Sequence, residues 1–154
     1  MTETSPVELS IIEVTARKSD YMDLLLIGDE SEEMVRRYVD VCNLYVGFVD
    51  GVAVSCIAAL AIDAGTVEVK NLAVIPESRR RGVGRRMLAH VEGLHAGCKI
   101  CLGTGETPST IRFYQSCGYR YSHRVIGFFT DNYPDPIVEE GITLRDMLYL
   151  SKLL

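Results

Sequence analysis

The sequence lacks any apolar run long enough to cross a membrane. The longest stretches, such as residues 52–62, are interrupted by Ser55 and fall short of the roughly 20 residues that a spanning helix needs. Residues 1–6 are polar and acidic and lack a basic start followed by an apolar stretch, so we expect no export signal. These two absences predict a cytoplasmic protein that does not bind membranes.

Positive charge is also scarce in the chain as a whole. The 16 lysines and arginines stand against 21 acidic residues, which gives a formal net charge of −5. Nucleic acids and anionic membranes need an extended basic surface, so this balance argues against both as partners. The basic charge that is present gathers at one place, because five arginines fall within residues 79–86. A local basic site in an acidic protein suits a small polyanion better than a polymer.

The cysteine pattern of a disulfide-bonded or zinc-binding domain is missing too. The five cysteines are an odd number, which without an export signal indicates reduced thiols. His95, Cys98 and Cys101 form an H-x-x-C-x-x-C pattern, but zinc needs a fourth ligand and there is no second C-x-x-C. These residues straddle the expected end of a helix and start of a strand, where small side chains pack well. We therefore predict no metal site.

The length and the hydrophobic pattern predict a single domain that covers residues 1–154. A chain of 154 residues, 47% of them hydrophobic, has the size and composition of one ordinary globular domain. Asp50-Gly51 lies between two apolar, β-branched runs and is a strong signal for a β-hairpin. The elements expected in the first half are a strand at 7–16, a helix from Ser19 as N-cap to Gly28, a helix around 34–42, and strands at 43–49, 52–62 and 66–74.

The second half alternates helices and strands. The expected elements are a helix at 80–95, a short strand at 99–102, a helix between Thr107 as N-cap and Gly118, a strand at 119–129, an acidic loop at 131–141 and a last strand at 142–150. The resulting order is β-α-α-β-β-β-α-β-α-β-β. It predicts a mixed α/β (α+β) fold with a central, mostly antiparallel sheet of about seven strands and about four helices.

A loop rich in glycine and arginine joins the strand at 66–74 to the following helix. Residues 79–84 read Arg-Arg-Arg-Gly-Val-Gly and lie where the helix begins. A helix start offers backbone N–H groups and the positive end of the helix dipole to an anion, and glycines let a phosphate approach the backbone closely. The chain lacks the G-x-x-x-x-G-K-[ST] loop of nucleotide-binding proteins and the third glycine of a Rossmann loop. The segment therefore predicts another kind of phosphate site, with a solvated basic helix start as the alternative.

Two motifs resemble those of a known family. The acyl-CoA signature of the GNAT superfamily of N-acetyltransferases is similar to Leu72-Ala73-Val74-x-Pro76-x-x-Arg79-x-x-Gly82-x-Gly84. The next motif of that family resembles Ile111-Arg112-Phe113-Tyr114-x-x-x-Gly118-Tyr119, and the expected element order resembles the GNAT fold over nearly the whole chain. The ending at residues 141–147 resembles that of a bacterial subgroup usually assigned to small-molecule substrates.

This resemblance implies an acetyl-CoA-dependent N-acetyltransferase that uses no metal. It implies that backbone amides of residues 80–85 hold the pyrophosphate, and that the strand ending at Val74 pairs with the pantetheine arm and polarises the thioester carbonyl. Thr107 stands where the family often has an asparagine for the pantetheine arm and Thr110 where alanine is usual, so Thr107 either contacts the cofactor or only caps its helix. The implied cofactor-binding residues are Leu72, Ala73, Val74, Arg79, Arg80, Arg81, Gly82, Val83, Gly84, Arg85 and Thr107.

Tyr114 and Glu68 are the candidate catalytic residues. Acetyl transfer from a thioester needs a neutral amine, a stabilised carbonyl oxygen and a proton for the departing thiolate, but no covalent enzyme intermediate. The resemblance makes Tyr114 the acid, and the alternative is that Tyr114 packs with Phe113 and Cys117 in the core. Glu68 lies 82 − 68 = 14 residues before Gly82, a spacing similar to that of the glutamate base in histone-acetylating relatives. The alternative for Glu68 is an ion pair on the sheet surface.

We expect the acceptor to be the primary amine of a small molecule. An acidic and aromatic rim would select a cationic amine, although a solvated acidic loop is an equal alternative. His123 is a further candidate for substrate contact. The rim consists of Asp131, Asp135, Glu139 and Glu140 with Phe128, Phe129 and Tyr133 nearby.

Two other functions stay open on the sequence. One is N-acetylation of a protein or peptide, which would need an open groove for the acceptor. The other is acyl-CoA sensing without catalysis, which would bind CoA tightly but show no turnover. Two copies could also pair as a homodimer through the edge of the last strand.

Overall fold

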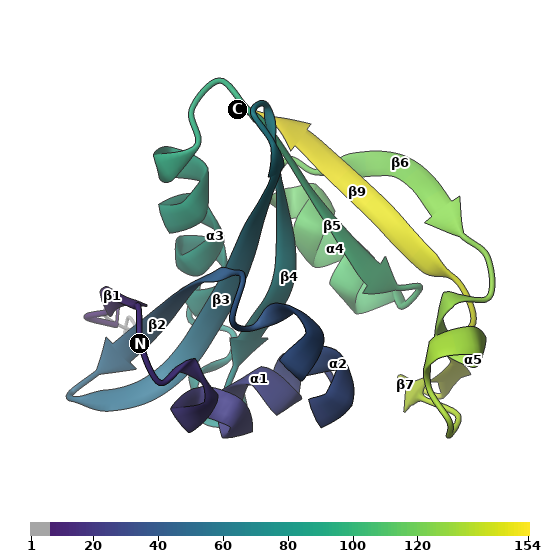
Figure 1. Cartoon of the computed structure of the whole chain (residues 1–154), viewed down its shortest axis with the longest axis horizontal. Helices are drawn as coiled ribbons and strands as arrows, with labels where there is room; N and C mark the ends of the chain where they lie inside the picture. Colours follow the sequence, from purple (N-terminus) through teal and green to yellow (C-terminus); the bar gives the residue numbers. More distant parts are fainter. Residues whose placement is uncertain (1–6) are drawn as a thin grey trace, which may run out of the picture. The chain divides into compact units, whose positions relative to one another are not determined.

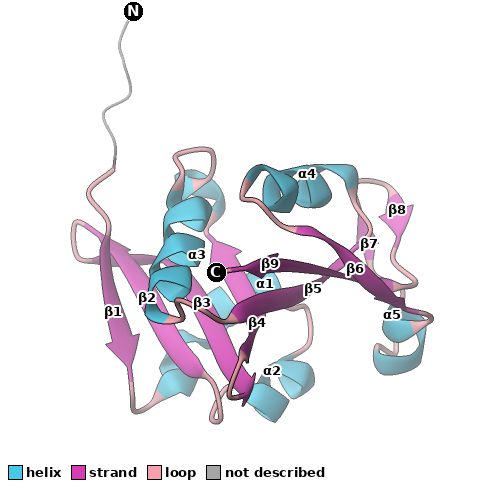
Figure 2. Ribbon diagram, turned by 90° about the horizontal axis from the view of Figure 1, so that it is seen from above, coloured by secondary structure: helices cyan, strands magenta, loops and turns pink. Residues whose placement is uncertain are grey.

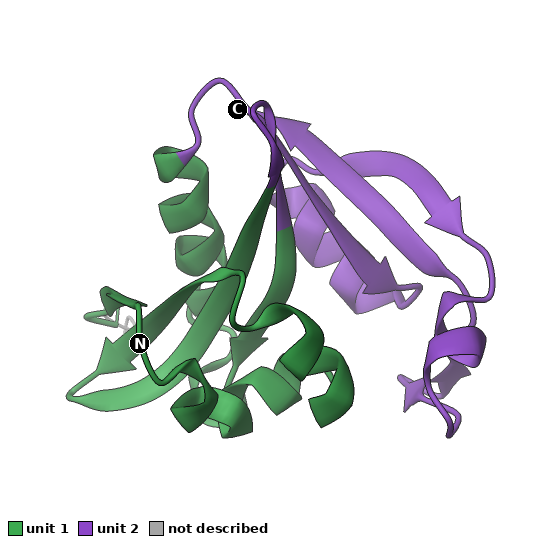
Figure 3. Ribbon diagram, viewed as in Figure 1, with its two compact units in different colours: residues 1–61, 69–94 green, residues 62–68, 95–154 purple. Residues whose placement is uncertain are grey.

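The computed structural model describes residues 7–154 and divides the chain into two compact units (Figure 3). Unit 1 comprises the chain up to Ala61 together with Val69–Leu94, and unit 2 comprises Ile62–Glu68 and His95–Leu154. The segment on which the absence of an export signal was inferred, residues 1–6, lies outside the described residues. Between residues 7 and 154, no helix is long and apolar enough to cross a membrane. That the chain forms a single domain stays a prediction.

The strands of unit 1 follow the order β1-β2-β3-β4 (Figure 1). Their bounds are Ser10–Val14 for β1, Asn43–Val49 for β2, Val52–Asp63 for β3 and Thr66–Val74 for β4, and the last two run on into unit 2. β1 pairs with β2, and β2 with β3, both in antiparallel register. The predicted hairpin is confirmed, because Asp50 and Gly51 have φ values of 50° and 77°, the positive values of a type I′ turn.

Helices cover both faces of the unit 1 sheet (Figure 2). Leu44 and Val46 of β2 pack in one buried cluster with Leu25 of α1 (Met22–Gly28) and Val35 of α2 (Glu32–Tyr38). Successive residues of a strand point to opposite faces, so Tyr45 points the other way. Its ring meets His90 of α3 (Val83–Leu94) edge to face, with centroids 5.0 Å apart.

The start of the first helical segment differs from the prediction. Ser19 is not the N-cap, because the segment opens as a 3-10 turn, η1 (Lys18–Tyr21), and α1 follows with Tyr21 as its N-cap. Lys18 connects this turn to the end of the second helical segment, since its ammonium donates hydrogen bonds to the carbonyls of Asp40 (3.3 Å) and Cys42 (2.5 Å). The second helix, α2, begins and ends earlier than predicted, and Ser31 caps it by accepting the Met34 N–H at 3.2 Å.

Unit 2 is built on three strands in the order β5-β9-β6 (Figure 1). β9 (Met147–Leu153) lies between β5 (Lys99–Gly105) and β6 (Arg120–Val125) and pairs with both in antiparallel register. Helix α4 (Pro108–Ser116) follows β5 and ends ahead of Gly118, whose φ of 94° suits a helix terminator as predicted. The remaining elements are α5 (Phe128–Asn132), β7 (Val138–Glu139) and β8 (Ile142–Thr143).

The segment after Tyr119 departs most from the prediction. The expected strand at 119–129 ends at Val125, and α5 follows, because Gly127 takes a φ of 70° and its N–H donates to the Asp146 carboxylate at 2.9 Å. The expected last strand at 142–150 is two strands, β8 and β9. β9 is flanked on both sides, so it has no edge through which two copies could pair. The end strand of this set is β6.

The mixed α/β prediction is confirmed at the level of the architecture. Within residues 7–154, the orders β1-β2-β3-β4 and β5-β9-β6 together comprise seven strands. The pairs β1/β2, β2/β3, β5/β9 and β6/β9 are all antiparallel. The described chain has five α-helices rather than about four, and the additional one is α5. The short strands β7 and β8 form a separate two-stranded ribbon, in which β7 comes from the segment predicted as an acidic loop and β8 from the start of the predicted last strand.

Candidate active site

The predicted phosphate loop lies in unit 1, where β4 gives way to α3. After the 3-10 turn η2 (Pro76–Ser78), the chain passes through Arg80 and Gly82, which have φ values of 63° and 75°. The first backbone hydrogen bond of α3 is donated by the Arg86 N–H to the Gly82 carbonyl at 3.1 Å. The backbone N–H groups of Val83 and Gly84 therefore have no acceptor within the helix and belong to the positive end of the helix dipole. This geometry suits an anion.

Arg79 has a local role that sequence reasoning missed. Its Nε donates a hydrogen bond to the Val74 carbonyl at 3.1 Å, and the Ile75 N–H donates to the Val54 carbonyl at 2.9 Å. The side chain of Arg79 thus ties the loop back to the end of β4. Of the strand residues assigned to the cofactor, Ala73 is buried, whereas Leu72 and Val74 are half-buried.

Tyr114 lies on α4 in unit 2, half-buried among aromatic rings. Its ring packs edge to face against Phe113, with centroids 5.1 Å apart, and against Tyr119 at 5.9 Å. Burial raises the pKa of the Tyr114 phenol above its ordinary value, and the neighbouring Cys117 adds to the increase. The phenol therefore stays protonated at neutral pH and can serve as a proton donor.

Thr107 occupies the N-cap position of α4, with Pro108 at the first helical position as predicted. Its side chain makes no capping hydrogen bond, so the prediction that Thr107 caps the helix is wrong for the side chain. The hydroxyl donates instead to the Thr110 hydroxyl at 2.9 Å, and the residue is only 1% exposed. Contact of Thr107 with a pantetheine arm stays a prediction.

Glu68 lies in the part of β4 that belongs to unit 2 and is 9% exposed. The Tyr149 hydroxyl of β9 donates a hydrogen bond to Glu68 Oε2 at 3.4 Å. Burial raises the pKa of Tyr149 to about 12, and the charge of Glu68 and this hydrogen bond contribute to the increase. On its other side, the Tyr149 ring stacks on His123, with centroids 4.6 Å apart and planes 6° from parallel. No motif or spacing in the sequence pointed to Tyr149.

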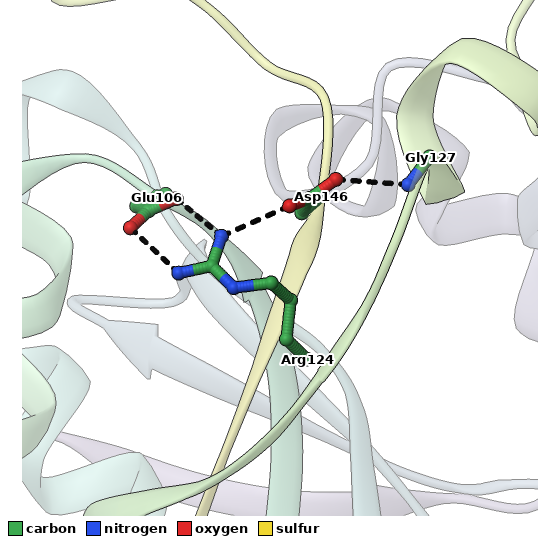
Figure 4. A network of polar contacts seen from close by, with 4 residues as sticks. All are labelled: Glu106, Arg124, Gly127 and Asp146. Atoms are coloured by element: carbon green, nitrogen blue, oxygen red, sulfur yellow. Dashed lines mark hydrogen bonds and ion pairs between the residues drawn. The ribbon is translucent and has the colours of Figure 1, made fainter.

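An ion-pair network, also missed from the sequence, joins four segments of unit 2 (Figure 4). The Arg124 guanidinium on β6 donates to both oxygens of Glu106, at 2.7 and 3.0 Å, and to Asp146 Oδ2 at 3.0 Å. Asp146 Oδ1 accepts the Gly127 N–H. The Gly127 N–H and Arg124 lower the pKa of Asp146, and the hydrogen bond from Arg124 lowers that of Glu106. The network therefore fixes the turn at which α5 begins.

The predicted acceptor rim is divided between exposed carboxylates and packed rings. Its acidic residues are all exposed. Phe128, Phe129 and Tyr133 pack against one another, with ring centroids 5.2 to 6.4 Å apart, and are half-buried. The three rings therefore stabilise α5, and a substrate contact would use their exposed edges. In the part of the chain that the structure describes, no three His, Cys, Asp or Glu residues gather as a metal site.

Comparison with known proteins places this geometry in a family. Residues 40–121 match the family described as the acetyltransferase (GNAT) domain. An uncharacterized N-acetyltransferase, YvbK, of Bacillus subtilis is 29% identical over 83% of this chain and 85% of its own length.

Two solved structures share the fold along almost their full length. A GNAT family acetyltransferase from Elizabethkingia anophelis with acetyl-CoA bound is 32% identical, with a TM-score of 0.87 over 95% of this chain and 98% of its own. An IAA acetyltransferase from Bacillus cereus is 28% identical, with a TM-score of 0.88 over 96% of this chain and 100% of its own. The chain belongs to the GNAT family, has its fold, and is an acetyltransferase.

Proposed function

We propose that the chain transfers an acetyl group from acetyl-CoA to the primary amine of a small molecule, by direct attack and without a covalent enzyme intermediate. The observation that carries this proposal is the loop at the start of α3, where glycine conformation, helix start and clustered arginines coincide. A 32% identical relative binds acetyl-CoA in its crystal structure, which supports the same donor here. No step of this reaction requires a metal.

The loop would hold the pyrophosphate of acetyl-CoA. Backbone amides of residues 80–85 supply hydrogen bonds in the proposal, and Arg80, Arg81 and Arg85 add charge-assisted ones. Arg79 supports the loop from within, because its bond to the Val74 carbonyl joins the loop to the end of β4. Leu72, Ala73 and Val74 at that end would lie along the pantetheine arm and offer an N–H to the thioester carbonyl, as the family resemblance implies.

Tyr114 and Glu68 would move the protons. A free thiol has a pKa of about 8.5 and an ordinary phenol about 10, so a phenol gives up its proton only as charge develops on sulfur. The raised pKa of Tyr114 keeps the phenol in the form that this role needs. Glu68 would take a proton from the acceptor ammonium, which leaves the amine lone pair to attack the thioester carbonyl. The departing CoA sulfur would then take the Tyr114 proton, and the second proton lost by the acetylated nitrogen would restore the Tyr114 phenol through solvent. The products are the acetamide, the CoA thiol and the one proton that Glu68 later releases to water.

The test begins with binding. We expect acetyl-CoA to bind with micromolar affinity in calorimetry, and analogues without the phosphates to bind much more weakly. Gly82→Ala should raise the Kd for acetyl-CoA on the order of tenfold, because an L side chain is strained at a φ of 75°. Gly93→Ala is the matched control. A Cβ meets nothing within 4 Å at either position, but Gly93 has an ordinary helical φ. Absence of binding in folded protein would refute the proposal.

Turnover on a panel of amines then decides between functions. Release of CoA thiol with a polyamine, an amino sugar or a lysine-like amine supports the small-molecule reaction. Acetylation of peptides alone would identify a protein N-acetyltransferase. Tight binding of acetyl-CoA with no turnover on any amine would identify a sensor.

A further inference from the structure

Tyr149 occupies the middle of a row of residues that crosses three strands of unit 2. In the register of the sheet, Tyr149 of β9 lies opposite Gly103 of β5 on one side and His123 of β6 on the other. Its hydroxyl reaches the carboxylate of Glu68 on β4. A residue on the last strand of the chain is thus connected to the candidate base 81 positions earlier.

The neighbours of Tyr149 fix where its ring can lie. Gly103 leaves space beside the ring, because a Cβ at that position would lie 3.1 Å from Tyr149 Cζ and 2.3 Å from Met147 Sδ. On the opposite side, the parallel His123 ring covers the face of Tyr149. A bulge between Tyr121 and His123 sets the position of His123, and the Ser122 hydroxyl lies 3.0 Å from His123 Nδ1. The phenol is therefore held in place from both sides.

We propose that Tyr149 is a positioning residue for Glu68, and that His123 positions Tyr149 in turn. The Tyr149 O–H donates to Glu68 Oε2 and so limits the orientations from which the carboxylate takes the proton of the acceptor ammonium. This inference rests on the proposed function, in which Glu68 is the base. The proton passes from the ammonium nitrogen to the Glu68 carboxylate and later to water, and Tyr149 keeps its own proton throughout.

Two physical features support this role. A phenol with a pKa near 12 remains a hydrogen-bond donor throughout the neutral range. The contact of the Tyr149 hydroxyl with one carboxylate oxygen at 3.4 Å limits the rotation of the carboxylate, and base catalysis depends on such alignment. The charged or titratable groups that act on Tyr149 are Glu68 and Cys101, and the ring stacked on it is that of His123.

A spectroscopic experiment tests the contact without any acceptor. In protein labelled with ¹³C at tyrosine Cζ, Tyr149→Phe identifies the Tyr149 resonance. Glu68→Gln should shift this resonance at neutral pH and make the phenol begin to ionise at lower pH, because the negative charge that raises its pKa is gone. Glu32→Gln, which changes an exposed carboxylate paired with Arg36, is the control and should leave the resonance in place. An unchanged resonance in Glu68→Gln would overturn the proposal.

Kinetics test whether the contact matters for catalysis. Tyr149→Phe should lower kcat on the order of tenfold and leave KM for acetyl-CoA unchanged, since a misaligned base slows proton removal. In a Glu68→Gln background, Tyr149→Phe should lower kcat by less than about twofold, because the two side chains act as a unit. His123→Phe, which keeps a stacking ring, should retain more activity than His123→Ala.

The outcomes separate the two proposals. The positioning role would be overturned if Tyr149→Phe kept the full kcat. It would also be overturned if the decrease in kcat of the double variant equalled the product of the decreases in the two single variants. Neither result would contradict the proposed acetyltransferase function. A wild-type chain that acetylates no amine would refute the proposed function, and the spectroscopic result would still report on the Tyr149 contact.

Discussion

Tyr114 is held by its surroundings in the one protonation state that its proposed role needs. It lies on a short helix whose end is fixed by Lys152, which donates to the Cys117 carbonyl at 2.9 Å, and its ring is enclosed by Phe113 and Tyr119. Removal of its hydroxyl changes the chemistry but leaves the packing of the ring in place. Tyr114→Phe is therefore a sharp test of the acid.

We predict that Tyr114→Phe lowers kcat on the order of a hundredfold with little change in the calorimetric Kd for acetyl-CoA, since general acid catalysis typically contributes about 10²-fold or more. Tyr121→Phe is the matched control, because Tyr121 is 59% exposed on β6. Equal kcat values in the wild type and Tyr114→Phe would show that another group or water protonates the thiolate.

At the scale of elements, the segment that carries α5 depends on ionised carboxylates. Asp146 and Glu106 have pKa values below their ordinary range in the folded protein. A carboxyl group with a lowered pKa stabilises the fold above its unfolded pKa of about 4, and that stabilisation is lost as the pH falls through the folded value. The turn at Gly127 should therefore open in acid before the sheet does.

Amide exchange at Gly127 measures this opening. After correction for the intrinsic rate, its protection should stay constant from about pH 6 to about pH 5 and decrease as the pH falls below about 4. Asp146→Asn should lower the protection at the higher pH on the order of tenfold, because the charge-assisted acceptor is lost. Asp135→Asn, an exposed change in the same segment, should have no effect. A Gly127 amide that stays protected in Asp146→Asn would show that the network does not hold the turn.

Some elements could be predicted from the sequence and others could not, and the difference lies in how far along the chain their contacts reach. The hairpin at Asp50-Gly51 and the end of α4 at Gly118 follow from local conformational preference, so the residues themselves predict them. The turn at Gly127 depends on Asp146, 19 positions later, and Tyr149 reaches Glu68 across 81 positions. Such contacts form only when the sheet brings distant strands together, and neither periodicity nor motif spacing reports them.

For the molecule as a whole, the prediction of reduced thiols can be tested directly, because all five cysteines are thiols in the structure of residues 7–154. Cys42 and Cys56 are 2% and 0% exposed, and burial raises the pKa of the Cys56 thiol to about 12. Cys98, Cys101 and Cys117 are half-buried. Thiol reactivity should therefore divide the cysteines into two groups.

We predict that Cys42 and Cys56 react with a thiol reagent on the order of a hundredfold more slowly than the other three in native protein, and at similar rates once the chain is unfolded. Mass spectrometry of the labelled peptides identifies each site. Rapid native labelling of Cys56 would mean that the buried cluster which Cys56 forms with α1 and α2 opens frequently.

The bulge at Ser122 also has a consequence for solubility. β6 ends the strand order, its six side chains are all exposed, and it carries Arg120 and Arg124. A flat, uncharged edge invites another chain to extend the sheet, whereas a bulged edge with charged side chains is a poor template. The irregularity that sets His123 beside Tyr149 thus also makes β6 a poor template for the addition of a strand from another copy.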